Sequence, residues 1–269
     1  MSSIRKPDFV HEEKAMKNLA GKTALITGGS RGIGAAVAVA LAKNGASVFL
    51  AANDIEGFFE QVVSDCSSAN PSARATYGIF DFLREGDAEK MVEAALQAYG
   101  RVDILVNNAA IRINKPFGEF TSIDFDQAIS VNLKAVFMAS QAVIPAMKAN
   151  GGGRIVNIAS QMGMVTDQHM SLYGLTKAAL IHLTKSMAFE LAPYNILVNA
   201  VSPGPTMTEF NIDRTTKHPA LKARRLSYVR TGRYIDPEEI ADVVAFLATT
   251  GALSMLGHNL VVDGGYVTH

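Results

Sequence analysis

Residues 27–34 of this 269-residue chain read Thr27-Gly28-Gly29-Ser30-Arg31-Gly32-Ile33-Gly34. They follow a short apolar run at 23–27 and lead into an apolar helical stretch at 35–42. Glycines between a strand and a helix let the backbone turn tightly and approach a pyrophosphate, whose charge the amides at the helix N-terminus then meet. Because short glycine patterns also occur as plain turns, this loop indicates dinucleotide binding without establishing it.

The rest of the chain repeats the alternation of strand and helix that begins at this loop. Short apolar runs bounded by Gly, Asn or Pro predict seven buried strands, at residues 23–27, 47–51, 74–80, 102–106, 154–158, 196–201 and 259–262. Amphipathic patterns predict helices between them at 87–99, 125–148, 173–191 and 238–249. Right-handed crossovers then give a mostly parallel sheet with helices on both faces. We predict one α/β domain over residues 19–269, a doubly wound Rossmann-like fold, after a polar leader or arm at 1–18.

Composition excludes several classes of protein. The 25 Lys and Arg residues balance 25 Asp and Glu, which argues against a nucleic-acid partner. Cys66 is the single cysteine and cannot form an internal disulfide, which favours a reducing compartment. The polar residues 1–18 lack the apolar stretch of a signal peptide, and no run of about eighteen uninterrupted apolar residues occurs. We therefore expect a soluble, cytoplasmic protein with no membrane partner and no metal site.

Small or polar residues follow several of the predicted strands. Asp81-Phe82 comes after the third, Asn107-Asn108-Ala109-Ala110 after the fourth, Ser160 after the fifth and Ser202-Pro203-Gly204-Pro205-Thr206 after the sixth. Ligands of open parallel sheets bind outside the carboxyl ends of the strands, so these residues should gather at one rim. Taken singly, each also fits a helix cap or a turn.

Tyr173 and Lys177 lie four residues apart at the start of a predicted helix, and hence on one helix face. A nearby positive charge favours the phenolate, and moving a tyrosine pKa from about 10 to between 7 and 8 needs roughly 3–4 kcal/mol. Lys177 and a nicotinamide cation could supply this together. The same spacing occurs by chance on many helices, so its meaning depends on the other motifs.

Together these motifs resemble the classical short-chain dehydrogenase/reductase family over nearly the whole chain. The family's glycine loop matches residues 27–34, its Asn-Asn-Ala-Gly signature matches 107–110, and its late signature matches 263–265. Its helical asparagine matches Asn132, its serine matches Ser160, and its Pro-Gly motif matches Pro203-Gly204. Ala110 replaces the usual glycine, a mild change that a backbone with positive φ would resist.

The resemblance implies an NAD(P)-dependent oxidoreductase that interconverts a secondary alcohol and a ketone, as an alcohol dehydrogenase or carbonyl reductase does. Tyr173 would act as general acid or base, and Ser160 would stabilise the carbonyl oxygen. Lys177 would lower the pKa of Tyr173 and bind the nicotinamide ribose, and Asn132 would hold a relay water. The implied cofactor contacts are Gly28, Ser30, Arg31, Gly32, Ile33, Gly34, Asn53, Asp81, Phe82, Asn108, Ala109, Tyr173, Lys177, Pro203, Gly204, Thr206 and Thr208. The implied substrate contacts are Gln161, Met162, His169, Met170 and Phe210.

The choice between NADP(H) and NAD(H) is open at this point. Ala52 stands in the family's acidic position and Asn53 in its common arginine position, so neither determinant is present. Arg31 favours NADP(H), whereas a second strand two residues longer would place Asp54 in the acidic position and favour NAD(H).

The segment 214–233, the oligomeric state and an alternative function complete the predictions from the sequence. The charge-rich segment 214–233 is typical of a solvated, mobile lid, and would otherwise attract an acidic or phosphorylated substrate. The resemblance implies a homotetramer built on the helices at 125–148 and 173–191. The alternative function is a non-catalytic redox sensor on the same fold, although such a protein need not keep all four of the implied catalytic residues.

Overall fold

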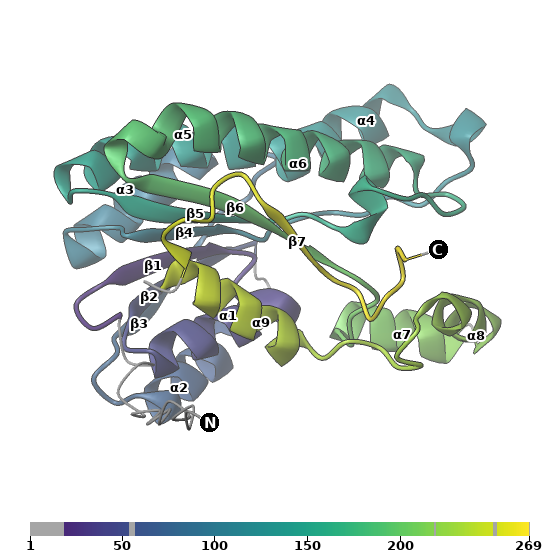
Figure 1. Ribbon diagram of the computed structural model, residues 1–269, viewed down its shortest axis with the longest axis horizontal. Helices are drawn as coiled ribbons and strands as arrows, with labels where there is room; N and C mark the ends of the chain where they lie inside the picture. Colours follow the sequence, from purple (N-terminus) through teal and green to yellow (C-terminus); the bar gives the residue numbers. More distant parts are fainter. Residues whose placement is uncertain (1–18, 54–56, 218, 250–251, 269) are drawn as a thin grey trace, which may run out of the picture.

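In the computed structural model seven strands form one parallel sheet in the order β3-β2-β1-β4-β5-β6-β7 (Figure 1). The structure describes residues 19–53, 57–217, 219–249 and 252–268, so the predicted leader at 1–18 lies outside the described residues. The strands are β1 (Thr23–Thr27), β2 (Ser47–Ala52), β3 (Ala75–Ile79), β4 (Ile104–Asn107), β5 (Gly153–Ile158), β6 (Ile196–Pro203) and β7 (Asn259–Val262). The predicted fold class is confirmed, and each predicted strand ends within two residues of the observed one.

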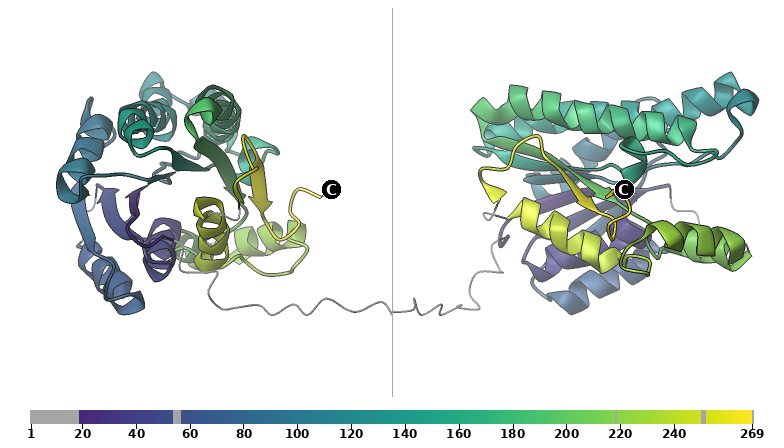
Figure 2. Two further views of the ribbon diagram at one scale, coloured as in Figure 1. Left: turned by 60° about the vertical axis from the view of Figure 1, so that its left-hand side comes forward. Right: turned by 45° about the vertical axis from the view of Figure 1, so that its right-hand side comes forward.

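Helices cover both faces of the sheet (Figure 2). One layer holds α1 (Gly32–Lys43), α2 (Phe59–Ala69) and α9 (Pro237–Ala248). The other holds α3 (Asp87–Tyr99), α5 (Ala135–Ala149) and α6 (Ser171–Leu191). α7 (Glu209–Lys217) and α8 (Pro219–Tyr228) follow the carboxyl end of β6 and stand apart from both layers, at the right in Figure 1.

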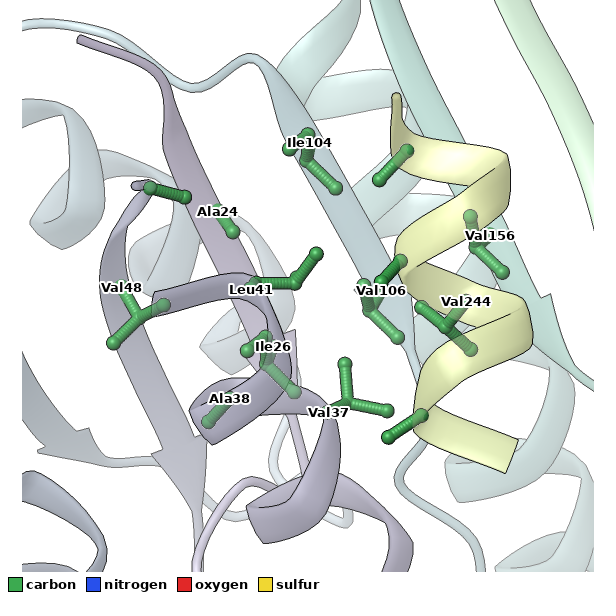
Figure 3. Packing of buried hydrophobic residues seen from close by; sticks show 14 of the residues in the cluster. Ala24, Ile26, Val37, Ala38, Leu41, Val48, Ile104, Val106, Val156 and Val244 are labelled. Atoms are coloured by element: carbon green, nitrogen blue, oxygen red, sulfur yellow. The ribbon is translucent and has the colours of Figure 1, made fainter. Parts of the chain in front are cut away.

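Two hydrophobic layers, one on each face, hold the sheet in place. Side chains alternate along a strand, so Ile26 of β1 faces the layer of α1 and α9 whereas its neighbour Leu25 faces the layer of α3 and α5. Figure 3 shows the first layer, where Ile26 and Val106 of the sheet lie beside Val37 of α1 and Val244 of α9. Burial on both faces explains why the strands read as uninterrupted apolar runs.

The helix predicted at 125–148 is present as a continuous helix over Ser122–Ala149, with a π-helical turn inside it. A capping box of Thr121 and Asp124 begins α4 (Ser122–Ile129), and a π-helical turn at Ser130–Lys134 joins it to α5. By length and a mean hydropathy of 1.3, the stretch Ser122–Ala149 could cross a membrane. On α5 the side chains of Val143 and Met147 are buried against the sheet, whereas Phe137 is 44% exposed.

Three helices were not predicted. In α2 the buried residues Phe59, Val62 and Cys66 do follow helical spacing, but they are few among polar residues. α7 and α8 fall in the charge-rich segment that was expected to be a solvated lid. That expectation is wrong for Arg225 of α8, whose side chain is buried.

The strand order positions the site. β1 lies between β2 and β4, so the chain leaves β1 toward one edge of the sheet and returns at β4 to continue toward the other. At such a switch point the loops that follow the two strands separate and leave a crevice at the carboxyl ends. The glycine loop follows β1 and the Asn108 turn follows β4, so both predicted motifs face this crevice.

Candidate active site

The loop after β1 has a shape that glycine alone permits. Gly28 and Gly32 have φ of +63° and +55°, in the left-handed region. A Cβ on Gly34 would lie 2.0 Å from the carbonyl oxygen of Gly28. α1 begins at Gly32 without a side-chain cap and without an acidic residue in its first turn, so its first amides point to the crevice uncompensated. This is the arrangement that accepts a pyrophosphate.

Hydrogen bonds between the ends of β1 and β4 fix this loop. Thr27 Oγ1 accepts hydrogen bonds from the amides of Asn108 at 2.9 Å and Ala109 at 3.0 Å. Asn108 Nδ2 donates to the carbonyl oxygens of Thr27 and Gly28, both at 3.0 Å. Among the described residues other than glycine, positive φ occurs only at His169 and Asn195, so alanine at position 110 meets no backbone strain.

A cavity of about 680 Å³ extends along the carboxyl ends of the strands. The predicted cofactor contacts line it except Gly34, which is packed behind the loop. Ser160, Tyr173 and Lys177 line the same cavity, as do the expected substrate contacts Gln161, Met162 and Met170.

Two expected substrate contacts are not placed in this cavity. His169 does not line it and lies instead in the turn before α6, with a left-handed φ of +63°. Phe210 lies in α7, and its side chain is outside the described part of the chain.

Several lining residues were missed by the sequence analysis: Arg112, Asp167, Asn211 and Tyr266. Arg225, which also lines the cavity, belongs to the charge-rich segment 214–233 that was expected to be a solvated lid or to attract an acidic substrate. The four missed residues belong to no motif, and they reach the cavity from loops, from α7 and from the C-terminal tail. The one available signal was position, since Arg112 follows the Asn-Asn-Ala-Ala turn by two residues.

Lys177 is buried beside the tyrosine. Its side chain is only 2% exposed, and Nζ donates a hydrogen bond to the carbonyl oxygen of Ile158 at 2.7 Å. Nζ lies 5.8 Å from the ring centroid of Tyr173, so the spacing of four residues does bring the two groups together. Loss of hydration disfavours the ammonium and lowers the pKa of Lys177 to about 8.

The pKa of Tyr173 is raised, whereas the sequence analysis expected Lys177 to lower it. Burial raises it above its usual value, because the phenolate loses its hydration. The charge of Arg112 and a hydrogen bond with Ser160 act the other way but do not prevail. In the protein by itself Tyr173 therefore keeps its proton, and the cation that favours its phenolate is Arg112 rather than Lys177.

Asn132 lies in the π-helical turn and is fully engaged. Its Oδ1 accepts a hydrogen bond from the amide of Ile111 at 2.8 Å, and its Nδ2 donates to the Ile111 carbonyl at 2.9 Å. Nδ2 also donates to Thr176 Oγ1 at 3.1 Å. Asn132 does not line the cavity, and its side chain ties the turn before Arg112 to α6. A relay water at this residue would have to use main-chain groups, which π-helical turns leave without regular helical partners.

Comparison with known proteins agrees with the fold and the motifs. The profile of the short chain dehydrogenase family matches residues 22–219. The chain belongs to this family of oxidoreductases.

Similar proteins align with this short chain dehydrogenase over nearly its whole length. It is 36% identical to an uncharacterized oxidoreductase of Escherichia coli (strain K12), over 93% of this chain and 94% of the relative. It is 38% identical to the L-xylulose reductase of Mesocricetus auratus, over 93% of this chain and 98% of the reductase. Among solved structures, it is similar to a 3-oxoacyl (acyl-carrier-protein) reductase from Agrobacterium tumefaciens C58 with NADP bound. The TM-score is 0.88 and the sequence identity is 32%, over 96% of this chain and 99% of the reductase.

The buried Lys177 predicts how stability depends on pH. Its pKa is about 8 in the folded protein and about 10.4 in an unfolded chain, so between these values only the unfolded chain holds the proton. Stability contributed by this group therefore rises with pH in that window, by up to about 3 kcal/mol. Urea unfolding from pH 7 to 10 should show wild type gaining free energy of unfolding relative to Lys177→Met. Lys185→Met, which removes an exposed lysine of the same helix, should follow wild type. Parallel curves for wild type and Lys177→Met would contradict the burial of this ammonium.

Proposed function

We propose that this short chain dehydrogenase interconverts a secondary alcohol and a ketone with NAD(P)(H). The observation that carries this proposal is that Ser160, Tyr173 and Lys177 line the same cavity as the glycine loop. The loop fits the pyrophosphate, and the rim of strand ends extends from it to Tyr173. When bound there, the nicotinamide supplies hydride transfer.

Each residue has a part that follows from its surroundings. Tyr173 is protonated in the protein by itself, as an acid must be, and gives its proton to the carbonyl oxygen during reduction; in oxidation it takes the proton back. Ser160 Oγ already accepts a hydrogen bond from the amide of Met162 at 3.1 Å, so its remaining capacity as a donor can serve the reacting oxygen.

Lys177 and Asn132 support this pair. One N–H of the Lys177 ammonium is held by Ile158, and the others remain to bind ribose hydroxyls at the cavity wall. Asn132 acts as a positioning residue, because it fixes the turn that carries Arg112.

Replacement of the tyrosine tests the enzymatic proposal. Tyr173→Phe should reduce kcat at least about 100-fold across a panel of ketones, oxo acids, sugars, steroids and acyl thioesters, because general acid catalysis is lost. The affinity for NADPH should change no more than about twofold, since the ring remains. Residual activity above a few per cent of wild type would contradict the role of Tyr173. An inactive wild type that still binds NADPH would favour a redox sensor.

We further propose that the cofactor is NADP(H). β2 ends at Ala52, which lines the cavity at the position where a carboxylate would select NAD(H), and Asn53 and Arg31 line the same cavity. Arg31 lies with its guanidinium carbon 6.0 Å from the Phe58 ring, at the mouth of the glycine loop. Asp54, the residue that would favour NAD(H), is outside the described residues.

The arginine gives a direct test of cofactor choice. Arg31→Ala should raise the KM for NADPH about tenfold or more, through loss of the phosphate contact, and leave the KM for NADH within about twofold. Arg74→Ala removes a surface arginine that stacks on Tyr99 instead, and should change neither value. If Arg31→Ala changed the KM for NADPH and the KM for NADH equally, Arg31 would not discriminate between the two cofactors, and the proposal of NADP(H) would be contradicted.

We also propose a cytoplasmic homotetramer that uses the faces of α4, α5 and α6. Large apolar side chains are exposed there, with Phe189 86% exposed and Phe125, Phe137 and Leu175 about half exposed. Such a surface is typical of a protein interface.

Light scattering tests this assembly. We expect about four times the chain mass of 28.7 kDa, and a smaller assembly for Phe189→Asp because a buried carboxylate disfavours association. Ile79→Asp, at an exposed apolar residue on β3, should remain tetrameric. A monomeric wild type would contradict the proposal.

A further inference from the structure

Arg225 of α8 is a buried cation at the wall of the cavity. Its side chain is 7% exposed and lines the cavity. Among the described residues, no carboxylate forms an ion pair with Arg225 and no acceptor takes a hydrogen bond from it. A buried charge without an anionic partner costs free energy, so this position does not serve the stability of α8.

A second guanidinium, that of Arg112, lines the same cavity. The charge of Arg112 acts on the phenol of Tyr173. Its Nη2 donates to Asn211 Oδ1 at 3.3 Å, and Asn211 Nδ2 in turn donates to the carbonyl oxygen of Thr206 at 2.8 Å. Arg112 is thus held in place beside the reacting centre by residues of the α7 segment.

Among the described residues, the carboxylates that line the cavity form no ion pair with Arg225. Asp167 is bound by Arg224, the neighbour of Arg225 on α8. Glu209 is exposed, and its Oε2 lies 3.7 Å from where a Cβ on Gly32 would be, which places it over the glycine loop. Asp81 lies after β3, on the side of the loop away from Tyr173. The charge of Arg225 is therefore available to an anion that enters the cavity.

The buried side-chain amide of Gln161 places a second requirement on the ligand. Gln161 follows Ser160, is 4% exposed and lines the cavity, and its buried Oε1 has no hydrogen-bond partner among the described residues. An acceptor in this state is satisfied by a ligand that donates a hydrogen bond, such as a hydroxyl.

We propose that the substrate is a hydroxylated oxo acid, or the corresponding hydroxy acid, whose carboxylate is bound by Arg225 and Arg112 while a hydroxyl donates to Gln161. This inference rests on the proposed function and specifies its substrate class. In reduction the ketone carbon gains a hydride from the reduced dinucleotide, and the ketone oxygen gains the proton of Tyr173. The dinucleotide leaves oxidised, Tyr173 regains a proton from water, and the carboxylate is unchanged. Guanidinium groups suit this task because they bind a carboxylate through paired hydrogen bonds.

The test compares acids with neutral substrates of the same size. Sugar-sized hydroxylated oxo acids and the neutral ketoses of the same chain length are assayed with NADPH. Wild type should prefer an acid at least about tenfold in kcat/KM. Arg225→Gln should lose this preference through KM, and activity on the neutral ketose should stay within about twofold. Arg225→Lys should restore part of the preference. Lys222→Gln, which removes an exposed charge of the same helix, should behave as wild type.

Binding provides a readout that does not depend on turnover. Calorimetry of the NADP⁺-loaded protein should show binding of a sugar-sized hydroxy acid to wild type, weakened about tenfold or more in Arg225→Gln. Equal losses on acid and ketose in Arg225→Gln would overturn the inference and assign a structural role to Arg225. A wild type that prefers ketoses, or binds no hydroxy acid, would also overturn it, and activity lost in Tyr173→Phe would still support the proposed function. A wild type that binds the hydroxy acid but reduces nothing would instead overturn the proposed function.

Discussion

The close approach of Gly34 to the carbonyl oxygen of Gly28 is the constraint on which the site depends. No side chain fits between them, because a Cβ on Gly34 would lie 2.0 Å from that oxygen. The contact brings the first turn of α1 against the end of β1, where Asn108 of the next motif binds the same carbonyl. The free amides of α1, the switch point of the sheet and the strand ends that carry the other functional residues are thereby placed around one crevice.

Loss of hydration governs the proton chemistry in that crevice. It pushes both partners of the Tyr173 and Lys177 pair toward their neutral forms, raising the pKa of one and lowering that of the other. A protonated phenol is ready to act as an acid, and an ammonium with a pKa of about 8 responds to pH within the physiological range. Arg112 adds the charge that favours the phenolate, so a substrate anion that binds Arg112 also changes the electrostatic environment of the proton donor.

What the sequence predicts well is what depends on local spacing. The glycine loop, the strand ends and the four-residue separation of Tyr173 and Lys177 translate directly into backbone geometry, and the fold class follows from the alternation of strands and helices. Burial was not predictable in the same way. The raised pKa of Tyr173, the engaged side chain of Asn132 and the buried Arg225 arise from packing between segments far apart in the chain, and α7 and α8 carry few apolar residues to indicate them. Placement of His169 depended on the turn before α6, which no motif specifies.

The central claim is that the uncapped first turn of α1 binds the pyrophosphate of a dinucleotide. Hydrogen exchange of the wild-type protein, followed by mass spectrometry with and without saturating NADPH, tests this directly. The amides of residues 30–34 lack helical partners, so they should exchange fast in the protein without cofactor. Saturating NADPH should lower their exchange rates at least about tenfold, whereas the exchange rates of α3 should not change. Unchanged exchange at residues 30–34, with NADPH or with NADH, would contradict the account.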